Sequence, residues 1–188
     1  EETNAPYGLA KKMLLVQAQA YRQQYGFNGI YLLPVNLYGP GDTFDPDTSH
    51  VIPALIRRFH EAKVAGSSNV VIWGTGTPRR EFLYVDDMAS ASLHVMNLLQ
   101  EVYALHTQPM QSHINVGSGY DLTIADLTHH VAQAVGYTGQ ITFDTNKPDG
   151  APRKWMDSSR LNTLGWAPQI DLQKGLTLAY QDFVSCHA

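Results

Sequence analysis

Tyr7 and Lys11 are the first residues whose types and spacing could do chemistry. A separation of four places both side chains on one face of a helix. A tyrosine hydroxyl has an ordinary pKa near 10, and a lysine cation one turn away favours the phenolate, so the pair could transfer a proton near neutral pH. The spacing alone is a weak indication, because a chain of this composition is expected to contain about 0.3 Tyr-x-x-x-Lys pairs by chance.

The elements that must position this pair follow from hydrophobic patterning and turn residues. A helix is predicted over residues 7–25, entered at Asn4-Ala5-Pro6 and stopped by Gly26. Further helices are predicted at 51–65, from Asp86 or Asp87 to 103, at 123–135, 158–164 and 172–184, and strands at 29–35, 70–73, 81–85, 113–116 and 140–143. Asp86 and Asp87 are more typical of helix caps than of catalysts. The alternation predicts an α/β chain with mostly parallel strands.

The helix at 7–25 carries two apolar stripes. One contains Tyr7, Lys11, Leu14, Ala18, Tyr21 and Tyr25, and the other contains Leu9, Met13, Val16 and Ala20. One stripe can pack on a sheet, and the other then needs a partner, which predicts a homodimer through this helix. A helix buried on both sides within one subunit is an equal alternative.

Composition limits the classes of function. The 188 residues are 44% hydrophobic and 16% charged, which supports a buried core and excludes a disordered chain. A net charge of -4 argues against nucleic-acid and anionic-membrane partners. The single Cys186 excludes an internal disulfide framework. The sequence also has no apolar run of about 20 residues and no signal-peptide pattern. Together with the single cysteine, these features predict a cytoplasmic location.

Two other patterns lack the spacing that a binding site would need. The eight histidines lack metal-ligand spacing, so no metal site is predicted. Gly74-x-Gly76 and Gly117-x-Gly119 lack the third glycine of a dinucleotide fingerprint and are predicted to be turns.

Seven short runs of sequence carry a recognisable pattern. They are APYGLAKK (5–12), PVNLYGP (34–40), SHVIPALIRRF (49–59), WGTGTPRREFL (73–83), VDDMA (85–89), DGAPRK (149–154) and LGW (164–166). Together they resemble the GDP-L-fucose synthase family, which are NADP-dependent epimerase/reductases of GDP-4-keto-6-deoxy-D-mannose within the extended short-chain dehydrogenases/reductases. The resemblance covers essentially the whole chain, and the 49–59 and 149–154 runs look specific to this family.

The resemblance implies an α/β fold made of the C-terminal part of a Rossmann-type domain and a smaller α/β substrate-binding domain. Residues 1–50 would end the cofactor domain. Residues 51–188 would belong mainly to the substrate domain, with parts near 81–120 returning to the Rossmann sheet.

For catalysis, the resemblance implies C3/C5 epimerisation followed by reduction at C4. Tyr7 would protonate the C4 ketone oxygen, while Lys11 would hold the cofactor ribose and lower the pKa of Tyr7. His50 would reprotonate carbon during epimerisation. A near-neutral pKa suits this role, although a lone histidine is more commonly a polar surface or capping residue.

For binding, the resemblance implies NADP(H) as the cofactor and a GDP-sugar as the substrate. The cofactor would contact Tyr7, Lys11, His50 and the segment Pro34, Val35, Asn36 and Leu37, which could otherwise be a simple strand exit. The substrate would contact Arg58, Arg80 and Lys154, because guanidinium and ammonium groups offset the charge of a diphosphate. It would also contact Trp73 and Asp149, through neighbouring groups of the nucleotide sugar. Arg58 could instead lie on a solvated helix face, Trp73 in the core, and Asp149 in a loop turn.

The family's glycine-rich cofactor loop, its catalytic serine and the cysteine thought to act as epimerisation base do not occur in these 188 residues. Cys186 lies at the opposite end of the family pattern. We therefore expect the intact parent to be an enzyme, and the 188-residue chain alone to have little or no reductase activity. NADP rather than NAD rests on the family alone.

Two alternative functions are also compatible with the sequence. The first is another sugar-nucleotide enzyme of the same fold, such as a UDP-hexose 4-epimerase or a 4,6-dehydratase. Neither requires His50 with its Val-Ile-Pro-Ala neighbours. The second is a non-catalytic module that binds a nucleotide sugar.

Overall fold

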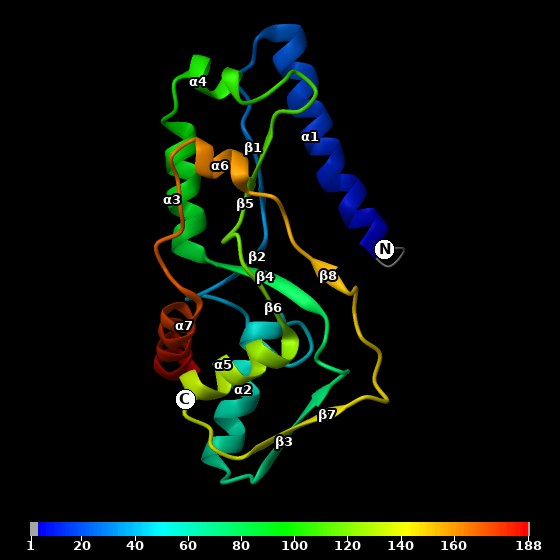
Figure 1. The fold of residues 1–188 in the computed structure, drawn as a ribbon, viewed down its shortest axis with the longest axis vertical. Coiled ribbons are helices and arrows are strands. Elements are labelled where there is room, and N and C mark those ends of the chain that lie inside the picture. The colour runs from blue at the N-terminus through cyan, green and yellow to red at the C-terminus, as the bar shows by residue number, and fades with distance from the viewer. Residues whose placement is uncertain (1–3, 188) are drawn as a thin grey trace.

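Short apolar runs bounded by glycine and proline form strands that alternate with helices in a computed structural model, which describes residues 4–187 (Figure 1). The helices are α1 (Ala5–Tyr25), α2 (Val51–Val64), α3 (Val85–Met96), α4 (Gln100–Leu105), α5 (Ile124–Val135), α6 (Ser159–Thr163) and α7 (Leu172–His187). The strands are β1 (Tyr31–Pro34), β2 (Asn36–Tyr38), β3 (Asn69–Trp73), β4 (Arg79–Tyr84), β5 (His113–Val116), β6 (Asp121–Thr123), β7 (Gln140–Asp144) and β8 (Arg153–Lys154).

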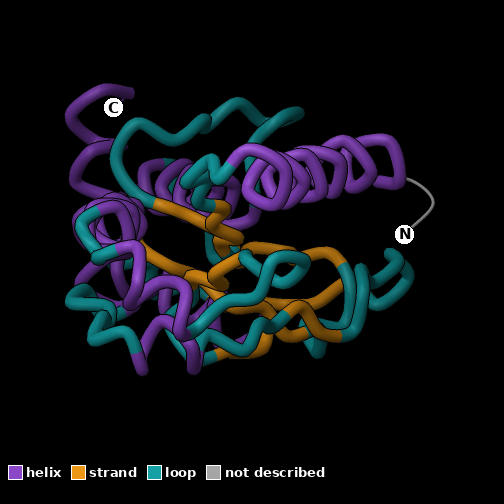
Figure 2. Tube along the Cα trace, turned by 90° about the horizontal axis from the view of Figure 1, so that it is seen from above, coloured by secondary structure: helices purple, strands orange, loops and turns teal. Residues whose placement is uncertain are grey.

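The strands form three small sheets. β1 pairs with β5, β3 pairs with β7, and the order β2-β4-β6 is extended by β8, which also pairs with β4. All of these pairs are parallel except β4 with β6, so the predicted α/β class and mostly parallel pairing are confirmed. Seen from above, the strands lie in the middle with helices on both sides (Figure 2).

Two hydrophobic cores meet at β4. Phe82 and Tyr84 belong to the core that α2, α5 and α7 build, whereas Leu83 belongs to the core around β5, α3 and α6. Successive side chains of a strand point to opposite faces, so one strand serves both cores. Phe59 on α2 is fully buried, which stabilises the fold by about 1.5–3 kcal/mol for a side chain of this kind.

The predicted ends of two helices are confirmed. α1 stops at Gly26, which has a left-handed φ of 64°. α5 begins after Thr123, whose hydroxyl accepts a hydrogen bond from the Asp126 N–H at 3.0 Å, and ends at Gly136 with φ 74°.

The prediction of one helix from Asp86 or Asp87 to residue 103 is wrong. α3 ends at Met96 and α4 starts at Gln100, with Leu99 in an extended conformation between them. Neither aspartate caps α3, because both lie inside its first turn.

Asp87 has a different structural role. Its buried carboxylate accepts the backbone N–H groups of Gln169 and Ile170 at 2.9 and 3.0 Å. The side chain therefore fixes the loop that leads into α7.

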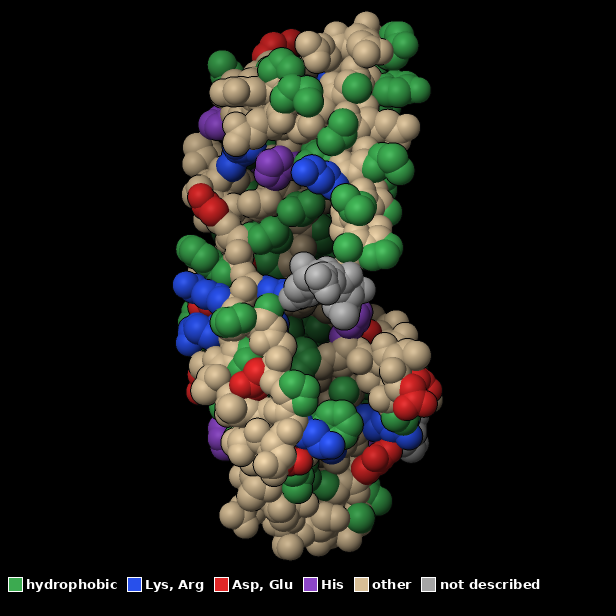
Figure 3. All heavy atoms as spheres, turned by 90° about the vertical axis from the view of Figure 1, so that its right-hand side faces the viewer, with side chains coloured by type: hydrophobic (Ala, Val, Ile, Leu, Met, Phe, Trp, Pro, Cys, Tyr) green, Lys and Arg blue, Asp and Glu red, His purple; other side chains and the backbone are tan. Residues whose placement is uncertain are grey.

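α1 lies along one side of the molecule with most of its surface open. Leu14 and Tyr21 of the first apolar stripe and Leu9 and Met13 of the second are all exposed. Gln19 is its buried residue. Hydrophobic side chains accordingly gather on the upper half of this face, over α1 (Figure 3). Among the described residues, no sheet covers either stripe, and the helix is not buried on both sides.

Candidate active site

A cleft of about 1040 Å³ lies beside β2, between the start of α2 and β8. It is lined by residues 34–42, 50–53 and 154–156 together with Tyr7, Phe82 and Val85. The cleft therefore brings together Tyr7, His50, Lys154 and the predicted segment Pro34, Val35, Asn36 and Leu37. These residues come from α1, β1, β2, the start of α2 and β8, so the site exists only in the folded chain.

Tyr7 and Lys11 share one face of α1, as the spacing predicted. The Lys11 ammonium lies over the Tyr7 ring, 5.4 Å from the ring centroid. The Tyr31 hydroxyl donates to the Lys11 carbonyl at 2.9 Å, which ties α1 to β1. Tyr7 is 68% exposed and its ring lines the cleft, so its hydroxyl is accessible to a substrate, whereas Lys11 lies outside the lining.

Tyr38 is a second tyrosine in the cleft with a different environment. Burial, and then the nearby Asp171 carboxylate, raise the pKa of Tyr38 well above its ordinary value. Its hydroxyl donates to the Leu172 carbonyl at 3.4 Å. Both features keep Tyr38 protonated and engaged with the backbone, which leaves Tyr7 as the better suited of the two for proton transfer.

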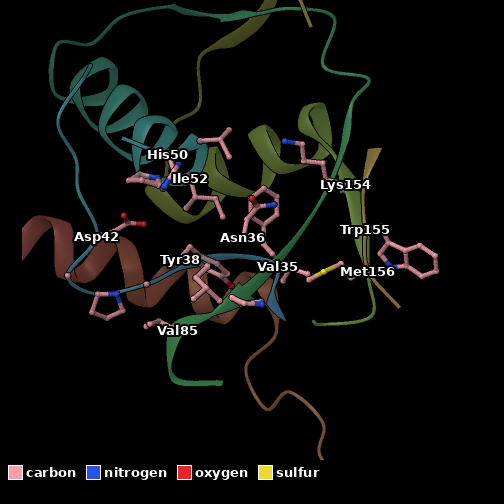
Figure 4. A pocket seen from close by; sticks show the side chains of 18 of the residues that line it. Val35, Asn36, Tyr38, Asp42, His50, Ile52, Val85, Lys154, Trp155 and Met156 are labelled. Atoms are coloured by element: carbon pink, nitrogen blue, oxygen red, sulfur yellow. The ribbon is translucent and has the colours of Figure 1, made fainter. Parts of the chain in front are cut away.

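His50 and Lys154 lie on opposite sides of the cleft, with Asn36 between them (Figure 4). His50 immediately precedes α2 with an extended backbone, and its side chain makes no capping hydrogen bond. The imidazole is therefore not used to cap the helix. Asn36 donates to the Glu81 carbonyl at 2.9 Å, which fixes β2 beside β4 at this point.

Lys154 belongs to an extended segment that ion pairs hold on the sheet. The buried Asp121 accepts from Arg79 Nη2 at 3.1 Å and from Arg153 Nε at 2.6 Å. Hydrogen bonds from Arg79 and then Arg153 hold the pKa of Asp121 below its usual value of 3.8. Arg80, predicted to bind substrate, donates from Nη1 to the carbonyls of Arg79 and Ala151, both at 2.7 Å.

Arg80 and the remaining predicted substrate residues, Arg58, Trp73 and Asp149, lie outside the lining of the cleft. Arg58 donates to a backbone carbonyl of β3 at 3.1 Å. Asp149 accepts from the Thr75 N–H at 2.9 Å and from its hydroxyl at 2.6 Å, bonds that lower the pKa of Asp149 and brace two loops. Trp73 is 66% exposed, which excludes its core alternative, and Lys147 lies 5.2 Å from its ring centroid.

Several cleft residues were missed by sequence reasoning. Trp155 and Met156 follow Lys154 directly, and Tyr38 follows the predicted 34–37 segment. Adjacency to these predicted residues is the only sequence feature that could have indicated them.

Within residues 4–187, no helix has the length and apolar character needed to cross a membrane. No group of three or more His, Cys, Asp or Glu side chains in this same range could hold a metal ion.

The sequence of this chain is similar to those of known proteins. The model of the NAD dependent epimerase/dehydratase family matches residues 1–117. GDP-L-fucose synthase of Escherichia coli (strain K12) is 54% identical over 184 residues, which cover 98% of this chain and 57% of that protein. The chain thus spans little more than half the length of this relative.

Solved structures agree with this similarity. The NADP-bound GDP-mannoheptose C4 reductase MlghC from Campylobacter jejuni has a TM-score of 0.85 at 31% identity, with 98% of this chain and 61% of that chain covered. A GDP-L-fucose synthetase from Naegleria fowleri bound to NADP has a TM-score of 0.84 at 25% identity, with 98% and 57% covered.

Proposed function

The chain belongs to the NAD dependent epimerase/dehydratase family, and from this premise we propose that the intact protein converts GDP-4-keto-6-deoxy-D-mannose to GDP-L-fucose. The reaction combines epimerisation at C3 and C5 with NADPH-dependent reduction at C4. The observation that carries the proposal is the cleft that joins Tyr7, His50 and Lys154. Identity of 54% to a protein named GDP-L-fucose synthase supports this choice of substrate.

The residues of the cleft fit the nicotinamide end of NADP(H). The 34–37 segment leaves the parallel strand β1 and enters the cleft, and ligands of open α/β sheets bind beyond the carboxyl ends of the strands. When bound, the cofactor supplies the hydride that reduces the ketone carbon. Lys11 is in reach of Tyr7 and would hold the ribose.

We assign residues 1–50 to the cofactor domain and residues 51–188 mainly to the substrate domain. Pairing of β5 with β1 supports the return of the 81–120 region to the cofactor sheet.

In the reduction, the Tyr7 hydroxyl donates its proton to the C4 ketone oxygen. The Lys11 cation beside the ring stabilises the phenolate that remains. The same hydroxyl serves the epimerisation, because a hydrogen bond to the ketone oxygen stabilises the enolate and makes the neighbouring C–H groups more acidic. Ketone reduction and enolisation therefore share one catalytic group.

In the epimerisation, His50 donates a proton to the enolate carbon from its side of the cleft. An imidazole is a suitable donor because it exchanges protons near neutral pH. We assign binding of the GDP-sugar diphosphate to Arg58, Arg80 and Lys154, with Trp73 and Asp149 contacting neighbouring groups of the nucleotide sugar. Lys154, which lines the cleft, is the best placed of the three cations.

We further propose that two copies of the protein pair through α1, whose exposed Leu9 and Met13 support such an interface. Met13→Glu would place a charge in that interface and is expected to convert the dimer to a monomer in sedimentation velocity. Gln181→Glu, an exposed change on α7, is the matched control and should sediment as wild type. A wild-type protein that sediments as a monomer would contradict this arrangement.

A cytoplasmic location is part of the proposal. The single Cys186, exposed and unpaired, supports a reducing compartment. Recovery of the protein in a secreted fraction after cell fractionation would contradict it.

The proposed function is tested by steady-state NADPH oxidation with GDP-4-keto-6-deoxy-D-mannose. The intact protein is expected to consume one NADPH for each GDP-L-fucose formed, and the 188-residue chain alone to show little or no turnover. Interconversion of UDP-hexoses by the intact protein, or binding of the keto sugar without turnover, would overturn the proposal. Clear turnover by the 188 residues alone would overturn the expectation for the shorter chain.

A further inference from the structure

Glu81 is a carboxylate buried in the middle of the sheet that the mechanism above does not use. It lies on β4 and is 0% exposed. Isolated charges are costly to bury, so a buried carboxylate needs several hydrogen-bond donors. One of the hydrogen-bond donors to Glu81 is in the segment that carries Lys154 into the lining of the cleft.

Three donors from two separate segments converge on Glu81. Oε1 accepts the Gly119 N–H at 2.8 Å and the Ser118 hydroxyl at 3.4 Å, and Oε2 accepts the Met156 N–H at 3.2 Å. The fit is close, because a Cβ at Gly117 would overlap the Glu81 carboxylate. The side chain therefore joins the turn after β5 to the segment after β8.

We call residues 151–158 the strap, because they run along the outside of the sheet from the β7 side to α6 (Figure 1). The strap carries Lys154 and Met156, which both line the cleft. The strap is also attached through the pairing of β8 with Arg79 and Arg80 on β4. In addition, the exposed Arg153 of the strap forms an ion pair with the buried Asp121. Glu81 holds the strap from inside, two residues beyond Lys154.

We propose that Glu81 is a positioning residue that fixes the strap, and with it Lys154, for binding the diphosphate of the GDP-sugar. The proposal rests on the function proposed above. Glu81 lines no part of the cleft and acts through the Met156 backbone, so its loss should weaken substrate binding and leave the proton transfers of Tyr7 and His50 in place.

Glu81→Gln tests this with almost no change in size. Each carboxylate oxygen faces a backbone N–H, so the amide nitrogen must face one of these donors. In the intact protein, KM for the GDP-sugar is expected to rise about tenfold while kcat changes less than about threefold, since hydrogen bonds to charged groups are among the strongest. Hydrogen exchange at the Met156 amide should accelerate in the same variant.

Two further variants separate positioning from general damage. Glu101→Gln, an exposed change on α4, should leave KM, kcat and Met156 exchange at wild-type values. In a Lys154→Ala background, Glu81→Gln should raise KM by less than about twofold, because coupled residues are not additive. A full tenfold rise in that background would overturn action through Lys154.

If Glu81→Gln does not fold, Arg153→Gln loosens the strap from its exposed side and should raise KM severalfold with kcat kept. The proposal is overturned if each of these two variants that folds keeps the wild-type KM, or if kcat falls as much as KM rises. A wild-type protein without turnover of the keto sugar would instead refute the proposed function. In that case the hydrogen-exchange rate of the Met156 amide in Glu81→Gln would still show whether Glu81 holds the strap.

Discussion

Tyr7→Phe in the intact protein is expected to lower kcat for ketone reduction by about 10²–10⁴-fold, the range that a positioned general acid contributes. Phenylalanine keeps the ring that lies beside Lys11 and removes only the hydroxyl that would protonate the ketone oxygen. KM for the GDP-sugar should change little, because the diphosphate contacts are untouched. The measurement is NADPH oxidation at saturating keto sugar.

The controls for this result are two other tyrosines. Tyr25→Phe changes an exposed ring at the far end of the same helix and should leave kcat unchanged. Tyr38→Phe removes a buried hydroxyl that lines the cleft but donates to the Leu172 carbonyl, and it should affect stability more than kcat. A larger loss of kcat in Tyr38→Phe than in Tyr7→Phe would move the acid to Tyr38 and contradict the assignment.

Local chemistry explains which parts of the fold could be predicted. The Tyr7–Lys11 face depends only on helical periodicity, and α5 is bounded by Thr123 and Gly136, whose cap geometry is set by neighbouring residues. Such features are encoded within a few residues and therefore survive in the folded chain. The break between α3 and α4 lacks any glycine or proline, and Asn97 after Met96 is a weaker helix-end signal.

The shortest strands could not be predicted for a different reason. β6 and β8 have three and two residues and exist because Arg79 and Arg80 on β4 pair with them across long stretches of sequence. Periodicity cannot be measured over so few residues. The same holds for Glu81, because its sequence neighbours do not indicate that residues 119 and 156 will meet its carboxylate.

The residues of the candidate site also differ in how far the sequence could predict their surroundings. His50, Lys154 and the 34–37 segment, to which the resemblance gives roles in catalysis and binding, line one cleft. Arg80 and Asp149 carry the residue types that suit a nucleotide sugar, yet their side chains also bond to the Ala151 carbonyl and to Thr75. Residue type identifies a capacity for binding, whereas the contacts that compete for it depend on the tertiary structure.

His50→Asn is the second change with a large expected effect, because it should separate the two halves of the reaction. Asparagine keeps a polar side chain at the start of α2 but cannot donate a proton to carbon near neutral pH. The epimerisation rate is expected to fall by about 10²–10⁴-fold. Reduction of a keto sugar that is already epimerised should survive, since Tyr7 is unchanged. Formation of the keto sugar inverted at C3 and C5, followed by NMR, and NADPH oxidation measure the two steps separately.

The outcome depends on which face of the sugar each group serves. A base takes the proton from one face and His50 returns it to the other, so the variant can still wash out substrate deuterium while forming no inverted product. His129→Asn, an exposed change on α5, should behave as wild type in both assays. Equal losses of epimerisation and reduction in His50→Asn would mean that His50 positions the cofactor or the sugar for both steps. Such a result would remove His50 from the role of carbon acid and leave Tyr7 as the only proton donor assigned in the cleft.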